Sequence, residues 1–109
     1  MEALLVRDSF TKLEEHLFLD IVRLGKEAAG GTIWSDYCER AGENIAIGQV
    51  YANLDKMERK GFITSRLETV VTNDGKKRKV RFFAPTDDGR EALRNSRATS
   101  NAFWKGVKI

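Results

Sequence analysis

The most informative segment of the chain is IGQVYANLDKMERKGFI, residues 47–63. Val50, Leu54 and Met57 recur there at intervals of four and three residues, so they lie on one face of a helix. Gly61 stands where a helix in this register would stop. Beyond it the apolar residues alternate, which is typical of a β-strand. The segment therefore predicts a helix that leads almost directly into a strand.

Two further helices are predicted before this segment. Thr11 and Glu14 have the spacing of a capping box, in which each side chain satisfies a backbone N–H at the start of a helix. Apolar residues then recur on one face as far as Leu24, which predicts a first helix from Thr11 to Leu24. A second, short helix is expected to begin with Thr32 as its cap and to end near Gly42.

A β-hairpin is predicted after the segment. Alternating residues from Ile63 to Val71 indicate one strand, and residues 80–84 indicate its partner. The sequence Asn-Asp-Gly at 73–75 favours a tight hairpin turn, because these residue types tolerate a positive φ. Pro85 has no N–H to donate, so the strand pairing should end there.

The C-terminal part predicts one more helix. Thr86 offers a helix cap, and Asp87 and Asp88 place acidic groups in the first turn. The apolar face fades beyond Asn95, so we expect a short helix with a frayed tail.

Three helices followed by a two-stranded hairpin form the winged helix-turn-helix arrangement, an α+β fold. In this arrangement the third helix, here residues 47–60, enters the major groove of DNA and the hairpin lies along the adjacent backbone. We expect a single domain of this kind over residues 1–109, with the C-terminal helix and tail, residues 86–109, in a dimer interface.

Composition agrees with one small domain. The chain has 109 residues, of which 41% are hydrophobic and 32% charged, enough for one core. No apolar run approaches the roughly 20 residues of a membrane span, and residues 1–7 lack the features of a secretion signal. We therefore expect a cytoplasmic protein without a membrane partner. A single cysteine, Cys38, and a single histidine, His16, leave no cysteine cluster or multi-histidine metal site, so no cofactor is expected.

The position of the charges is more informative than their sum. The net charge is only +3, yet residues 66–81 contain six basic and two acidic residues. The local surplus of four exceeds that of the whole chain. A charge run of this kind is often no more than a solvated turn. Directly after a recognition-type helix, it is better explained as a surface for the phosphate backbone.

Several motifs together resemble the PadR-type winged-helix transcriptional regulators. They are GKEAAG at 25–30, Ile33, IGQVYANLDKMERKGFI at 47–63 and FFAPTDDGR at 82–90. The family signature has an Ile-Gly-x-Val-Tyr start to the third helix, and the match spans roughly residues 13–93. The resemblance implies a dimeric DNA-binding repressor or activator, joined through its first and last helices. In some members a small aromatic ligand is held between the subunits.

Candidate DNA-binding residues lie on the third helix and the hairpin. Gln49 and Asn53 carry amides that could pair with adenine edges, unless they are simply solvent-exposed polar groups. Lys56 is expected to meet phosphate. Tyr51 fits the helix tyrosine of the family, which suggests a phosphate contact, although it could equally be a half-buried core aromatic. The hairpin adds four basic residues that can follow the backbone: Lys76, Lys77, Arg78 and Lys79.

A dimer interface is suggested by apolar residues that the small core does not need. Phe18 and Val22 form a second stripe beside the core-facing residues of the first helix. Phe103 and Trp104 lie on a tail without a core of its own. We expect these four residues to pack against a second subunit.

Two other classes of function have to be weighed. An enzyme would need a phosphate loop, a metal cluster or a nucleophile held by a base, and the sequence shows none of these. A winged-helix module that contacts another protein is the stronger alternative, since this fold also serves in protein interactions. Trp34 could line a ligand pocket or cover the core.

Overall fold

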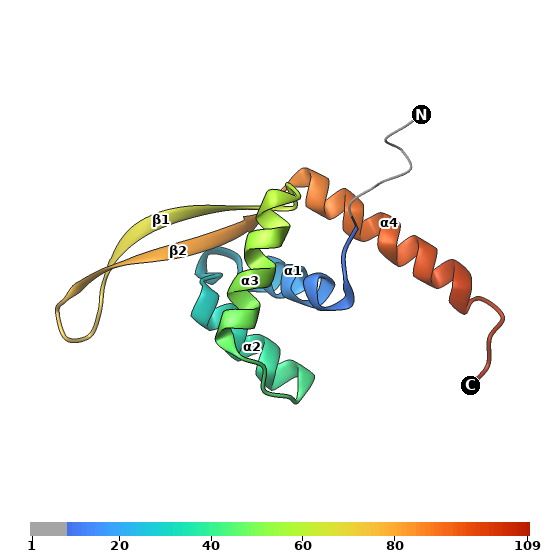
Figure 1. Ribbon diagram of the computed structural model, residues 1–109, viewed down its shortest axis with the longest axis horizontal. Helices are drawn as coiled ribbons and strands as arrows, with labels where there is room; N and C mark the ends of the chain where they lie inside the picture. The colour runs from blue at the N-terminus through green and yellow to red at the C-terminus, as the bar shows by residue number, and fades with distance from the viewer. Residues whose placement is uncertain (1–8) are drawn as a thin grey trace.

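The computed structural model describes residues 9–109, and the expectation about a secretion signal in residues 1–7 lies outside that range (Figure 1). Four helices and a two-stranded antiparallel sheet confirm the predicted α+β winged-helix arrangement. The elements are α1 (Lys12–Leu24), the 3₁₀ turn η2 (Gly25–Glu27), α2 (Gly30–Ala41), α3 (Ile47–Arg59), β1 (Ile63–Val71), β2 (Lys77–Pro85) and α4 (Asp87–Trp104).

The start of α1 has the predicted capping box. Thr11 Oγ1 accepts a hydrogen bond from the Glu14 backbone N–H at 3.1 Å, and Glu14 Oε1 accepts one from the Thr11 N–H at 2.9 Å. Helix α2, in contrast, begins earlier than predicted. Ala29 is its cap residue, and Thr32 Oγ1 reaches back to accept from the Ala29 N–H at 3.0 Å. Thr32 therefore stabilises the helix start from inside the first turn.

The core lies where α1, α2 and α3 meet, and the base of the sheet closes it. Leu17 and Ile21 of α1 are fully buried there, as predicted from their spacing. Burial of one such side chain contributes roughly 1.5 to 3 kcal/mol relative to leaving it exposed. The members of the core are Leu17, Phe18, Ile21, Ala28, Ile33, Tyr37, Val50, Leu54, Met57, Phe62, Ile63 and Phe83.

The hairpin is a wing whose base is buried and whose tip is exposed. Its register pairs Ile63 with Pro85 at the base and Val71 with Lys77 near the tip. Gly75 has a φ of +80° in the turn, a conformation that suits glycine. At the base, Phe83 donates its N–H to the Ala28 carbonyl at 2.8 Å, which attaches β2 to the body. The wing projects from one side of the helical body (Figure 1).

Helix α4 is longer than the sequence suggested, because it continues to Trp104 instead of fading after Asn95. No glycine or proline interrupts residues 91–105, so the backbone bonds can continue although the apolar face does not. The first turn docks on the body through Gly89, where an added Cβ would overlap Phe62 and the Phe18 ring. Ala92 and Leu93 still pack against the core, and beyond them α4 extends away on the side opposite the wing (Figure 1).

Phe18 does not lie on the surface, so the expected exposed stripe of Phe18 and Val22 is wrong for Phe18. Its side chain is fully buried. The first turn of α4 covers it, and its ring lies edge-on to that of Phe10 at 5.1 Å between centroids. Gly89 of α4 is far from Phe18 in the sequence, and Phe10 precedes the predicted first helix, so the spacing within that helix could not reveal either contact. Val22 remains 45% exposed.

Candidate nucleic-acid interface

Helix α3 is held by its apolar face, which leaves the rest of its surface free. Val50, Leu54 and Met57 are fully buried, as predicted. With about 100° of rotation per residue, Ala52 and Arg59 lie opposite these three and point directly outward. Both are exposed. Arg59 is therefore an interface candidate that the sequence reasoning missed, although the spacing from the core residues could have identified it.

Gln49 and Asn53 share one flank of α3 and differ in their freedom. Gln49 is exposed, whereas Asn53 is half-buried. The Asn53 amide nitrogen donates to the Gln49 backbone carbonyl at 2.8 Å. One donor of Asn53 is thus occupied within the helix, while the whole Gln49 amide remains available to a partner.

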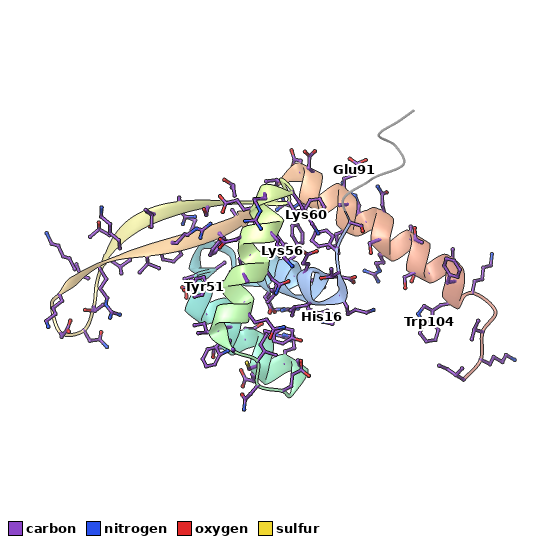
Figure 2. The ribbon with its side chains drawn as sticks, in the orientation of Figure 1. His16, Tyr51, Lys56, Lys60, Glu91 and Trp104 are labelled. Atoms are coloured by element: carbon purple, nitrogen blue, oxygen red, sulfur yellow. The ribbon has the colours of Figure 1, made fainter. Side chains whose placement is uncertain are left out.

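Lys56 and Lys60, on the same flank, differ in their surroundings. Lys56 is exposed, as expected for a group that could reach phosphate. Lys60 instead points to the N-terminal end of α1, where its Nζ lies 2.9 Å from Glu14 Oε1 and 2.9 Å from the Ser9 carbonyl (Figure 2). Glu14 is buried, so Lys60 compensates an interior carboxylate and does not extend outward.

Tyr51 lies on the opposite flank of α3 (Figure 2). Its side chain is 39% exposed, and its ring packs on the start of α2. Gly30 makes this possible, because a Cβ there would overlap the Tyr51 ring and hydroxyl. Tyr51 thus packs against the body with part of its ring and keeps the rest of its side chain accessible.

The wing presents its basic residues on two faces. Residues paired across the two strands lie on the same face of the sheet. Lys77 and Lys79 therefore share a face with Ser65 and Phe83 near the base, and this face packs toward α3. Arg78 lies on the other face, opposite Val70. Within residues 9–109, no ion pair involves any of the four expected tip residues, Lys76, Lys77, Arg78 and Lys79.

The tip turn has its own polar support. Asp74 Oδ1 accepts from the Lys76 backbone N–H at 3.0 Å and also from the Thr72 hydroxyl. These hydrogen bonds, the one from Thr72 first, lower the pKa of the fully exposed Asp74 carboxyl. The turn therefore keeps a fixed shape while its cations remain free.

Arg81 connects the wing to α3. Its guanidinium pairs with Asp55 Oδ1 at 3.1 Å and with Glu58, and its Nε donates to Ser65 Oγ at 3.1 Å. The Ser65 hydroxyl in turn donates to Glu58 at 2.9 Å. Arg66 is also paired, with Glu68. Two of the six basic residues of the wing, Arg66 and Arg81, thus form ion pairs within the chain. The sequence alone did not distinguish them from the other four.

The remaining candidate residues lie far from this surface. Phe103 is 80% and Trp104 57% exposed, both at the end of α4 (Figure 2). Trp34 is half-buried, and its Nε1 donates to the Ile45 carbonyl at 2.7 Å, so it braces the loop before α3. In the described part of the chain, no cluster of three or more potential metal ligands occurs. Across residues 9–109, every helix is too short or too polar to cross a membrane.

Comparisons with solved structures find the same fold in other proteins. H. salinarum RosR is 20% identical and gives a TM-score of 0.62, with 91% of this chain and 81% of that chain covered. A PadR family transcription regulator from Clostridium difficile R20291 is also 20% identical, with a TM-score of 0.62 over 84% and 91% of the two chains. Bacillus subtilis PadR, solved in complex with operator DNA, is 21% identical with a TM-score of 0.59 over 90% of this chain and 61% of that chain.

The comparison with families is more specific than these structural likenesses. No curated protein matches the chain by sequence. The family model of the transcriptional regulator PadR-like family matches residues 19–95, which include α2, α3 and the whole wing. This family consists of regulators and not of enzymes, so the enzymatic alternative is excluded. The chain belongs to the PadR-like family of transcriptional regulators.

Proposed function

We propose that this regulator binds an operator as a homodimer, with α3 of each subunit in the major groove and the wing along the adjacent backbone. The proposal rests on two accessible surfaces, one on α3 and one on the wing. Lys77 and Lys79 lie on the face of the wing that packs toward α3, and within residues 9–109 neither forms an ion pair. The residues of α3 that point away from the core are exposed as well. A helix fits the major groove, and flexible cations follow phosphate without reading sequence.

Base selection is assigned to Gln49 and phosphate contact to Lys56 and Arg59. A free amide can make paired hydrogen bonds to an adenine edge, whereas a cation mainly meets the backbone. Asn53 contributes through its carbonyl oxygen, since its nitrogen already donates within the helix. Tyr51 reaches the backbone with its hydroxyl at the edge of the same surface.

The preferred site is an inverted repeat. A two-fold dimer presents two identical α3 helices, and their half-sites then lie about one helical turn of DNA apart. Repression follows when the dimer occupies a promoter. The resemblance to the family adds a small aromatic effector between the subunits. B. subtilis PadR, whose structure contains operator DNA, supports DNA as the partner of the fold.

The specificity test compares two variants on two duplexes. Gln49→Ala is expected to cost roughly 1 to 3 kcal/mol on a site selected from random DNA and to leave binding to a scrambled duplex almost unchanged, because a base contact is lost and no charge. Lys56→Ala should weaken both. Asn53→Ala is the matched amide control and should have a smaller effect than Gln49→Ala. An equal loss on both duplexes for Gln49→Ala would remove base reading from this residue.

The alternative function is a winged-helix protein-interaction module, which the exposed apolar residues of the wing favour. Leu67 and Val71 are each 67% exposed on the face that also carries Lys77. The salt dependence of the binding constant distinguishes the two functions, because cations that neutralise phosphates release counterions from DNA and affinity then falls as salt rises. With DNA as the partner, the double variant Lys77→Ala/Lys79→Ala flattens the salt slope by about one unit per lost contact. A slope near zero for the unaltered protein would favour the interaction module.

A further inference from the structure

A groove separates α4 from the helical body of the domain. Its volume is about 1150 Å³. An apolar cavity of about 150 Å³ already holds a benzene molecule, so the groove has room for several side chains. Its apolar lining comes from Ala92 and from the rings of Phe10 and Phe62, which stack with 4.5 Å between their centroids. Further along α4 the lining residues are small or polar as far as Ser100, so another chain segment can approach the helix closely.

The charge of this groove is negative. Asp88 and Glu91 line it from the N-terminal part of α4, and both are exposed. Within residues 9–109, neither carboxylate forms an ion pair. Lys60 also lines the groove, but its Nζ lies 2.9 Å from Glu14 Oε1 and already compensates that buried carboxylate. An occupant that brings positive charge to this end of the groove is therefore favoured.

The other end of α4 has the complementary chemistry. Residues 92–109 contain four basic side chains and no acidic one, and Lys105 and Lys108 are among the basic ones. In the described part of the chain, neither of these two lysines forms an ion pair. Phe103 is 80% exposed, and its neighbour Trp104 marks this end of the helix in Figure 2. The helix thus carries acidic groups at its start and exposed apolar and cationic groups at its end.

The basic end of α4 cannot reach the groove of its own chain. Phe103 belongs to the continuous helix Asp87–Trp104, so at 1.5 Å per residue it stays about 16 Å from Ala92. Lys105 follows the helix directly and is about 21 Å from Glu91 by the same measure. The four residues after it span at most about 14 Å even when fully extended. A complementary end that fills the groove therefore has to come from another molecule.

We propose that the groove receives the C-terminal end of α4 from a second copy of this chain, and that the two α4 helices pack antiparallel so that each end fills the groove of the other copy. This inference rests on the proposed homodimer and assigns the surfaces that form it. Ala92, Thr99 and Phe103 are seven and four residues apart, so they share one face of α4. Ala92 and Thr99 line the groove, and Phe103 continues the same face toward the partner.

The charges set the direction of this packing. In an antiparallel pair with Phe103 on the apolar lining of the other copy, Lys105 comes level with the turn that holds Asp88 and Glu91. A parallel pair would instead place acids beside acids and lysines beside lysines, which is unfavourable. The antiparallel contact also uses the same surface of both copies, so it closes as a two-fold dimer.

Charge reversal at both ends of the contact tests the proposal. The dissociation constant of the dimer is measured by analytical ultracentrifugation of the DNA-free protein at low salt. The groove variant Asp88→Lys/Glu91→Lys and the tail variant Lys105→Glu/Lys108→Glu should each dimerise at least about tenfold more weakly, because opposite charges become like charges. An equimolar mixture of the two variants should form heterodimers of nearly the original affinity, since each copy supplies the charge that the other lacks. All four changes in one chain should restore the homodimer for the same reason.

Two controls accompany these variants. Asp87→Lys/Glu39→Lys reverses two exposed acids that do not line the groove, one of them also in the first turn of α4, and should leave dimerisation unchanged. Phe103→Ser removes an exposed side chain that the core of the monomer does not use, so the variant should fold normally and dimerise at least about tenfold more weakly. Leu67→Ser, an equally exposed apolar change on the wing, should have no such effect.

The failure of this contact and the failure of the homodimer give different results. A dimer that persists equally in the groove, tail and control variants would overturn the antiparallel contact and leave the homodimer standing, with the groove open to another occupant such as residues 1–8 of the same chain. A mixture that associates no better than its components would also overturn the contact. If a charge-reversed variant fails to fold, Phe103→Ser decides the question alone. A monomeric unaltered protein would contradict the homodimer and this contact together.

Discussion

The buried carboxyl of Asp20 makes the stability of the protein depend on pH. Its pKa is about 7 in the folded state, against an ordinary value of 3.8. Between these values the folded state binds the proton more tightly than the unfolded chain, so the free energy of unfolding falls as the pH rises from about 4 to about 7. The upper limit of this loss is about 4 kcal/mol. Urea unfolding at pH 5 and pH 8 should show a smaller difference for Asp20→Asn than for the unaltered protein, and an equal difference would contradict the assignment.

At Gly30, a single methyl group should move a residue of the DNA surface. On helix propensity alone, Gly30→Ala would stabilise α2 by roughly 0.5 to 1 kcal/mol. The new Cβ would however overlap the Tyr51 ring, so we expect lower stability and weaker binding to all duplexes. Gly31→Ala is the matched control, because no atom lies within 4 Å of its Cβ position. The hypothesis fails if both variants are equally stable and bind DNA equally well.

The residues that sequence alone placed correctly are those with local partners. The Thr11–Glu14 box and the buried face of α3 each depend on spacings within one helix. Phe18 was misplaced because Gly89, which packs on it, is distant in the chain. The ion pair of Lys60 with Glu14 joins residues that are equally far apart, so the sequence did not reveal it either. Whether a polar side chain already makes a hydrogen bond within the protein distinguishes Asn53 from Gln49. This property cannot be predicted until the side chains are placed in space.

Between elements, the Arg81 network fixes the wing against α3. Arg81→Gln leaves Asp55 and Glu58 as unpaired acids beside the proposed DNA surface. We expect weaker binding to selected and scrambled duplexes alike, through both repulsion and a looser wing. Glu58→Gln added to Arg81→Gln should restore part of the affinity, with a coupling energy of about 0.5 to 1 kcal/mol in a double-mutant cycle. Strict additivity of the two changes would remove this ion pair from the mechanism.

The ends of helices and strands were predictable where a turn or a glycine marks them in the sequence. The Asn-Asp-Gly turn at 73–75 placed the wing, and Gly61 marked the stop after α3. The end of α4 was not predictable from apolar periodicity, because most of the helix buries little of its surface. Its length reflects the absence of glycine and proline from residues 91–105, which favours a helix without requiring a core.

For the whole molecule, α4 and the exposed part of α1 predict association. Phe103, Trp104 and Val22 expose apolar surface that a second copy could cover. Light scattering at micromolar concentration should show a dimer. Trp104→Ala and Val22→Glu should shift it toward monomer, with Leu67→Ala on the wing as an exposed apolar control. A monomeric unaltered protein would contradict the dimer. Phe18 is unsuited to this test, because a charge at that position would disrupt the core.

The projecting wing also affects the kinetics of the search for DNA. Residues 66–81 carry a surplus of four positive charges, whereas the net charge of the chain is +3, so the remainder is almost neutral. The molecule is therefore electrically lopsided, with its positive pole at the end of a protruding arm (Figure 1). At physiological ionic strength the field of a charge extends about 8 Å. A polyanion would meet this arm first and orient the protein before α3 comes within reach of a base, so the wing would set the association rate and α3 the residence time.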